Sequence, residues 1–132
     1  MAGSKILESM AMLIRDRPMR QALLRALAEE QSARILAATS RRPLSAMELV
    51  RDLDLPSSSA YRRLHELEDA GLLVAARTVQ TKDGKKFQMY KATFQEVSVK
   101  FNAGEVVVTA VANADVVEKA FQLFHSFQGE GD

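Results

Sequence analysis

One segment, residues 57–70, combines small hydroxyl groups with long hydrogen-bond donors on a single helical face. On a helical wheel Ala60, Leu64 and Leu67 fall together, so we expect them to face the core. The other side carries Ser, Tyr, Arg and His side chains, with no acidic residue before Glu66. Hydroxyls near a helix N-terminus bind phosphate, and an Arg guanidinium can bind the O6 and N7 atoms of guanine. The pattern therefore predicts a helix that lies in the major groove of duplex DNA.

The predicted DNA-contacting residues of this helix are Ser57, Ser58, Ser59, Tyr61, Arg62, Arg63 and His65. We also expect Ser57 or Ser58 to cap the helix, and Tyr61 has packing against the preceding helix as an alternative role. His65 is interpreted as an exposed residue or a DNA-backbone contact rather than a metal ligand.

A basic turn follows between two extended segments, residues 72–79 and 87–93. Asp83-Gly84 is a strong hairpin signal. The turn carries three lysines that we expect to follow a phosphate backbone, namely Lys82, Lys85 and Lys86. The alternative is that these lysines only guard an exposed hairpin against edge pairing. Arg41 and Arg42 are weaker candidates for backbone contact.

The elements that would position these groups can be predicted from the pattern. Ser45 and Glu48 form a capping box, which starts a helix that ends in a turn at residues 54–57. Gly71 is expected to end the second helix. Apolar spacing predicts further helices, at residues 5–15, 17–29 and 30–40 before this unit and at 113–127 after it. Alternating apolar residues predict a second hairpin, with strands at 97–101 and 106–111 and burial of both faces of the second strand.

These elements amount to an α+β fold, mainly α, namely a winged helix-turn-helix with extra N-terminal helices and a C-terminal β-hairpin plus helix. We expect three units: an N-terminal helical arm at 1–29, the DNA-binding domain at 30–93, and a C-terminal hairpin and helix at 94–132. The apolar residues of the last predicted helix span an arc of roughly 160° around the helix axis. This arc is wider than a helix needs in order to bury one face against a small domain.

The composition and charge of the chain favour some classes of function and exclude others. The 132 residues have a net charge of +1, but residues 57–93 carry seven basic and four acidic side chains, whereas 94–132 carry two and six. Positive charge therefore gathers on the predicted DNA-reading segment. Aromatic content is 6% without Trp, which disfavours stacking on single strands. The absence of cysteine excludes disulfides and thiolate metal sites.

No enzyme is predicted, because the chain has no Gly-rich phosphate loop and no Cys nucleophile, and its only histidines, His65 and His125, lack an evident triad partner. No cofactor is expected. The sequence shows no transmembrane run and no signal-peptide pattern, so we expect a cytoplasmic protein without membrane contact.

Residues of about 30–93 resemble the winged helix-turn-helix domain of the arsenic-repressor (ArsR) superfamily, especially its archaeal-type members. The resemblance rests on the segments Ala33–Leu36, Leu44–Leu49, Ser58–Leu64 and Ala70–Leu72, together with Leu67. It implies a homodimeric transcription regulator that reads a palindromic site in double-stranded DNA, with the helix at 57–70 as recognition helix and residues 72–93 as wing.

In proteins of this family the terminal helices usually form the dimer interface, which agrees with the wide apolar arcs at both ends of the chain. The predicted dimerisation residues are Ile6, Met10, Leu13, Val117, Phe121 and Phe124. Metal-sensing members use cysteines or a His-rich last helix. Here Asp115 is followed by two valines and only His125 stands near the end, so metal sensing is not carried over.

Two alternatives stay open. A winged-helix module can serve protein contacts within a transcription or assembly complex, although that role favours apolar residues at positions 58, 62 and 65. An effector, whose identity is unknown, could occupy an apolar cleft, with core packing as the alternative role of its lining residues. That cleft would be lined by Val97, Val99, Phe101, Phe121 and Phe124.

Overall fold

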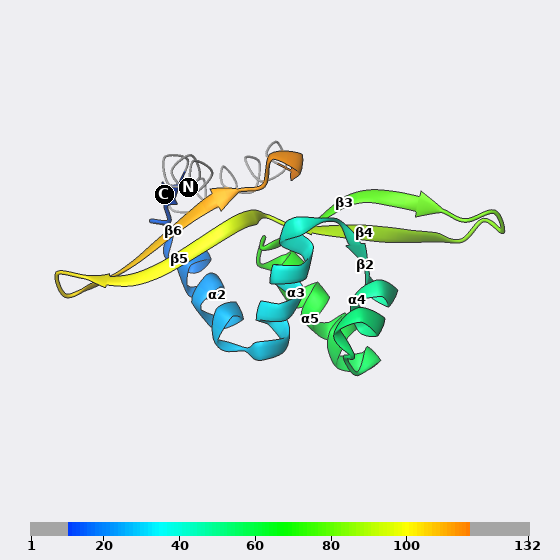
Figure 1. Ribbon diagram of the computed structural model, residues 1–132, viewed down its shortest axis with the longest axis horizontal. Helices are drawn as coiled ribbons and strands as arrows, with labels where there is room; N and C mark the ends of the chain where they lie inside the picture. Colours follow the sequence, from blue (N-terminus) through cyan, green and yellow to red (C-terminus); the bar gives the residue numbers. More distant parts are fainter. Residues whose placement is uncertain (1–10, 117–132) are drawn as a thin grey trace.

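The computed structural model describes residues 11–116, in which four α-helices lie below two β-hairpins that extend in opposite directions (Figure 1). The helices are α2 (Arg17–Ala28), α3 (Glu30–Arg41), α4 (Ala46–Leu53) and α5 (Ser57–Asp69). The strands are β1 (Met12–Leu13), β2 (Leu44–Ser45), β3 (Leu73–Gln80), β4 (Lys86–Ala92), β5 (Phe94–Asn102) and β6 (Glu105–Ala112), followed by a short 3-10 helix, η1 (Ala114–Val116).

Side chains that accept hydrogen bonds from the first turn start α2 and α3. The Asp16 carboxylate accepts from the Met19 amide at 2.9 Å, and Pro18 occupies the first turn of α2. Glu29 accepts from the amides of Gln31 and Ser32, at 3.2 and 2.7 Å, and so caps α3. The predicted helices at 17–29 and 30–40 are therefore confirmed to within one residue at each end.

The helix-turn-helix follows the predicted boundaries. The Ser45 hydroxyl accepts from the Glu48 amide and the Glu48 carboxylate accepts from the Ser45 amide, both at 3.1 Å, which confirms the capping box. Asp54 takes the left-handed conformation that ends α4 (φ 52°). Gly71 does the same after α5 (φ 80°), and the Leu72 amide then bonds the Leu67 carbonyl at 2.9 Å.

Two three-stranded antiparallel sheets complete the fold, with strand orders β2-β4-β3 and β1-β6-β5. The first sheet holds the predicted wing, whose strands pair from Leu73–Ala92 at the base to Gln80–Lys86 at the tip. The second holds the predicted C-terminal hairpin, and β1 adds to it through Met12–Ala110 and Leu13–Thr109. The α+β winged helix-turn-helix prediction is confirmed.

One apolar core joins the helices to both sheets. It includes Met19 and Leu23 of α2, Ile35 of α3, Leu64 of α5 and Val108 of β6, each with at most 4% of its surface exposed. Because the second hairpin and α2 share this core with the helix-turn-helix, α5 is held rigidly by packing from several elements. The proposed division of the chain into three units stays a prediction.

Three local predictions differ from the structure. Residues 11–15 do not continue a helix, because Met12–Leu13 forms β1; residues 5–10 lie outside the described part. Ala114–Val116 is a 3-10 turn, and the rest of the predicted helix at 113–127 also lies outside it. The outer half of β6 is not buried on both faces, since Val106 is 45% exposed.

Among the helices that the structure describes, none is long and apolar enough to cross a membrane.

Candidate nucleic-acid interface

The α5 helix presents one face to the core and the opposite face to solvent. Ala60, Leu64 and Leu67 are buried, as predicted. The exposed side contains five of the predicted DNA-contacting residues, namely Ser57, Ser58, Tyr61, Arg62 and His65. This helix and the β3–β4 hairpin lie toward the same end of the molecule (Figure 1). The sequence thus predicted the exposed face correctly for these five side chains.

The N-terminus of α5 differs from the prediction. Pro56 is the N-cap residue and no side chain caps the helix, so neither Ser57 nor Ser58 has the predicted capping role. The proline ring restrains φ to −60°, and with ψ at 131° the residue is extended. The first helical bond runs from the Ala60 amide to the Pro56 carbonyl at 2.9 Å. With no acidic residue in the first turn, the helix start keeps amide donors and the positive end of its dipole available to an anion.

Ser59 and Arg63 turn toward α3 rather than outward. The Ser59 hydroxyl donates to the Pro56 carbonyl at 3.1 Å and to Gln31 Oε1 at 3.5 Å. Arg63 Nε donates to Gln31 Oε1 at 2.9 Å, and its Nη1 lies 2.9 Å from Glu29 Oε2. Only 17% of the Arg63 side chain is exposed. Arg63 is therefore mostly covered by α3, which supplies acceptors that a single-helix wheel does not include, and its predicted contact with DNA stays a prediction.

The Glu29 carboxylate both caps α3 and forms an ion pair with Arg63 of α5. Hydrogen bonding by the Ser32 side chain is the main reason that the pKa of the Glu29 carboxyl lies below its ordinary value. Desolvation raises this pKa by a smaller amount than that bond lowers it. The amides of Ser32 and Gln31 and the charge of Arg63 lower it further. The ionised carboxylate caps α3 and pairs with α5 at the same time. It therefore fixes the start of one helix against the middle of the other.

The wing ends in a tight basic turn. The Thr81 amide donates to the Lys85 carbonyl at 2.8 Å, the Thr81 hydroxyl donates to the Asp83 carboxylate, and Gly84 adopts φ 87°. The three predicted contact lysines, Lys82, Lys85 and Lys86, are all exposed. The Asp-Gly hairpin prediction is confirmed, and the turn presents its cations at the end of a rigid ladder.

The helix-turn-helix region of the chain is similar to a known family of domains. Residues 27–74 match the family model of a helix-turn-helix domain, a span that contains α3, α4, the turn and α5. This span is therefore similar to a helix-turn-helix domain, in agreement with the α4–turn–α5 arrangement of the structure. Together with the β3–β4 hairpin that follows, this match agrees with the predicted winged helix-turn-helix; the assignment to the ArsR superfamily and to its archaeal-type members stays a prediction.

Three of the solved structures that are similar to the chain have a low overall similarity to it. HlyU from Vibrio cholerae is 20% identical with a TM-score of 0.41, and the match covers 85% of this chain and 95% of that one. HlyU from Vibrio vulnificus is 22% identical with a TM-score of 0.39, covering 81% and 84%. An ArsR family transcriptional regulator is 19% identical with a TM-score of 0.38, covering 85% and 88%. No curated protein matches the chain with significance.

Arg62 is a long cation that stays available on the exposed face of α5. Its Nη1 lies 3.7 Å from Glu66 Oε1, one helical turn away, and both side chains are about 60% exposed. Such a pair contributes little in water, so a stronger acceptor can replace Glu66 at small cost. The geometry leaves Arg62 free to reach a base edge or a phosphate.

Two features near the helix-turn-helix were not part of the sequence prediction. Arg77 on β3 adds an exposed cation to the wing, for which its place in the outer half of an extended segment was the available signal. Tyr90 on β4 is half-buried, and burial raises the pKa of its hydroxyl, with smaller contributions from Glu68 and Tyr61. Tyr61 therefore lies within electrostatic reach of the wing strand.

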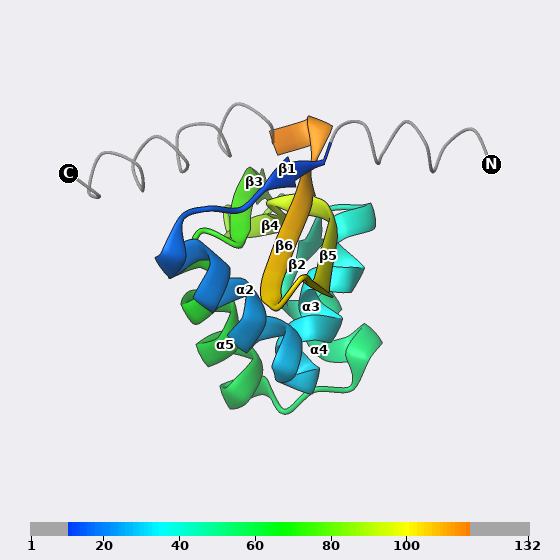
Figure 2. The same ribbon diagram turned by 90° about the vertical axis from the view of Figure 1, so that its left-hand side faces the viewer.

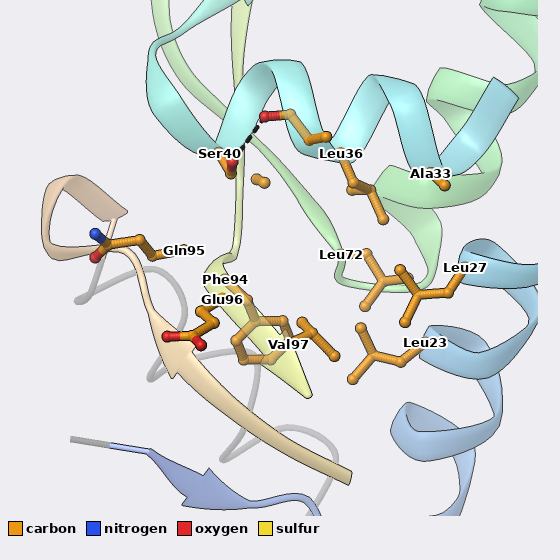
Figure 3. A pocket seen from close by; sticks show the side chains of 12 residues that line it. Leu23, Leu27, Ala33, Leu36, Ser40, Leu72, Phe94, Gln95, Glu96 and Val97 are labelled. Atoms are coloured by element: carbon orange, nitrogen blue, oxygen red, sulfur yellow. Dashed lines mark hydrogen bonds between the residues drawn. The ribbon is translucent and has the colours of Figure 1, made fainter. Parts of the chain in front are cut away.

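An apolar groove of about 230 Å³ lies between α2, α3 and the start of β5 (Figure 3). Leu23 and Leu27 of α2, Leu36 of α3 and Val97 of β5 form much of its wall. It is not the predicted cleft. Of that set Val97 alone lines it, Val99 and Phe101 are exposed by 43% and 88%, and Phe121 and Phe124 lie outside the described residues.

The remaining site predictions are only partly within the described chain. Of the predicted dimerisation residues, Leu13 is described and is 50% exposed on β1, whereas Ile6, Met10, Val117, Phe121 and Phe124 lie outside. Within residues 11–116 no group of three or more His, Asp or Glu side chains comes together as metal ligands would. His65 is exposed on α5, and His125 lies outside the described residues.

Proposed function

We propose that this chain is a transcription regulator that binds double-stranded DNA, with α5 in the major groove and the β3–β4 hairpin as a wing. The observation that carries the proposal is the open N-terminal half of α5. Its start has no side-chain cap and no acid, and its exposed side bears Ser57, Ser58, Tyr61 and Arg62. The protein-docking alternative gains no support here, since positions 58, 62 and 65 are polar and exposed.

Phosphate contact is assigned to the beginning of the helix. The amides of its first turn have no side-chain acceptor, and the hydroxyls of Ser57 and Ser58 stand beside them in solvent. Amide donors, hydroxyls and the positive end of the helix dipole together favour a phosphate oxygen at this point. A phosphate held there would set the depth and direction in which α5 enters the groove.

Base contact is assigned to Arg62. Its guanidinium leaves the helix one turn after the N-terminus and is held only by the exposed contact with Glu66. A guanine offers two acceptors to the planar guanidinium, whereas Glu66 meets it at 3.7 Å with one oxygen. Tyr61 and His65 would flank this contact on the same face.

Arg63 has a positioning role in this account. Its bonds to Gln31 and Glu29 tie α5 to the start of α3. That connection keeps the recognition helix from rotating and directs Arg62 outward.

The wing lysines would supply contacts that are independent of sequence. Lys82, Lys85 and Lys86 stand on an exposed turn at the far end of the β3–β4 ladder, and Arg77 stands behind them. Each phosphate neutralised releases counterions, which makes binding dependent on salt. Arg41 and Arg42, at the exposed C-terminal end of α3, remain secondary candidates.

We further propose that the protein acts as a homodimer on an inverted repeat. The two ends of the chain would provide the interface through the predicted dimerisation residues, and Leu13 and its neighbour Met12 on β1 are exposed. These predicted residues are Ile6, Met10, Leu13, Val117, Phe121 and Phe124. Two α5 helices one turn of DNA apart would need half-sites about 10 bp apart, centre to centre.

Titration of a random-sequence duplex in a series of salt concentrations tests the DNA-binding proposal. We expect affinity to fall linearly with salt on logarithmic axes, with one unit of slope for each phosphate contact, to within about 10%. Absence of binding at low salt would contradict it.

A further inference from the structure

The outer strand of the second sheet has a self-complementary sequence. β5 pairs with β6 on one side, and within the described residues no strand pairs with its other side. Glu96-Val97-Ser98-Val99-Lys100 reads, on antiparallel reversal, as a partner for itself: Glu96 comes opposite Lys100, Val97 opposite Val99, and Ser98 opposite Ser98. We propose that β5 binds β5 of a second copy of this chain in this register, which joins two sheets into one.

The strand has the exposure that such pairing needs. Glu96, Ser98 and Lys100 are exposed along one face, and Val99 is 43% exposed on the other. The hairpin extends beyond α2 on the side opposite the wing (Figures 1 and 2). Opposite charges that face each other across strands favour pairing, and like charges oppose it. A second copy supplies Lys100 for Glu96 and Glu96 for Lys100, so both charges find partners.

The apolar side of the strand gives an independent reason for a second copy. Val97, Val99 and Phe101 share a face, and their β6 partners are Ala110, Val108 and Val106. The inner part of that face is buried in the core, whereas Phe101 is 88% exposed and Val106 is 45% exposed. A large aromatic side chain at this exposure leaves an apolar surface without cover in the described chain.

The groove shown in Figure 3 lies beside the start of β5, where it could cover the exposed Phe101 side chain of a second copy. It opens beside Gln95 and Val97 at the start of β5. In the proposed register Phe101 of the second copy comes diagonal to Val97 and near Gln95, at the irregularity between Phe94 and Glu96, within reach of an aromatic side chain. The strand of the second copy would therefore lie over the groove, with its Phe101 directed at the apolar wall formed by Leu27 and Leu36.

This β5–β5 contact uses none of the residues proposed above for the dimer interface at the two ends of the chain, and it does not require DNA. Its register makes one position diagnostic. Ser98 faces itself, so two Cα atoms stand about 5 Å apart, a separation that a disulfide spans. The chain contains no cysteine, so Ser98→Cys introduces a single thiol.

The test is disulfide formation by Ser98→Cys under mild oxidation without DNA, with Asn102→Cys as the matched control. Asn102 is exposed on the same face of the same strand, but the two copies of it would lie about 27 Å apart in the proposed register. We expect a covalent dimer from Ser98→Cys and none from Asn102→Cys. Equal yields from the two variants, or no crosslink at position 98, would overturn the proposal.

Charge reversal provides a second test. Glu96→Lys places two lysines opposite each other and Lys100→Glu two glutamates, so each variant alone should weaken the contact by about tenfold or more. A mixture of the two variants restores both opposite-charge pairs and should associate as the wild type does, as measured by sedimentation. Unchanged association of the single variants would overturn this contact while leaving a homodimer through the two ends of the chain intact.

Discussion

The Arg63 guanidinium on α5 lies 2.9 Å from the Glu29 carboxylate that caps α3, measured from Nη1 to Oε2. The same guanidinium donates through Nε to Gln31 at 2.9 Å. One side chain of α5 is therefore bound to the first turn of α3 and to its N-cap at two points. The contact leaves Arg62, the next residue along, as the exposed cation of the pair.

Replacement of Arg63 by alanine should destabilise the protein. The bond to Gln31 alone is worth about 1 kcal/mol, and the loss of the contact with Glu29 adds to it. Arg62→Ala is the matched control, because a surface substitution of this kind changes stability by no more than about 0.5 kcal/mol. Urea denaturation of both variants measures the difference, and equal midpoints would show that the Arg63 contact contributes nothing.

Arg62→Ala should weaken binding to the preferred DNA site by about 1–3 kcal/mol and relax the choice of base at one position in each half-site. The reason is the loss of a paired contact to a base edge rather than a change in fold. Competition titrations with duplexes that differ at single positions would measure it. A variant that discriminates among these duplexes as well as the wild type does would remove Arg62 from the base-reading role.

Loss of the wing cations should have a different effect. Lys85→Ala combined with Lys86→Ala should weaken binding to all sequences alike and reduce the salt slope by up to about 2 units, because two phosphate contacts disappear. Gln80→Ala, which removes an exposed but uncharged side chain from the same hairpin, is the control and should leave the slope unchanged. If the wing variant keeps the wild-type slope, the wing does not track the DNA backbone.

Stability should depend on the ionisation of Glu29. The pKa of its carboxyl is lower in the folded protein than in the unfolded chain, so its contribution is fully present above the unfolded pKa, about 4.3, and is lost as the pH falls through the folded pKa. Glu29→Gln should therefore be less stable than the wild type at neutral pH, and the gap should close in acid. Urea midpoints of both proteins between pH 3 and 7 provide the comparison; a gap that does not change with pH would argue against this linkage.

The sequence was sufficient where a local signal determines the structure. The Ser45–Glu48 capping box, the glycine that ends α5 and the Asp-Gly turn of the wing each need only a few neighbouring residues. Their bounds were therefore predicted almost to the residue. The exposed face of α5 followed in the same way from the positions of Ala60, Leu64 and Leu67.

The sequence predictions differ from the structure where a segment far away in the sequence determines the local conformation or burial. Met12 and Leu13 have apolar neighbours at helical spacing, yet β6, almost a hundred residues away, pairs with them as a strand. Arg63 looked free on its own helix, but Gln31 and Glu29 hold it. The alternation placed Phe101 on the apolar face of its strand with Val97 and Val99, yet Phe101 is 88% exposed because this hairpin extends past α2 (Figure 1). A single-helix wheel or a strand pattern contains no information on such partners.

Selection from a random pool of duplex DNA, followed by sequencing of the retained molecules, tests the central claim most directly. If α5 reads the major groove in a homodimer, the retained pool should be enriched in an inverted repeat with half-sites about 10 bp apart or a multiple of that distance. The Arg62→Ala variant should retain the same repeat with one position relaxed. Retention of no DNA even at low salt, or of DNA without any enriched sequence, would contradict sequence-specific binding by this helix.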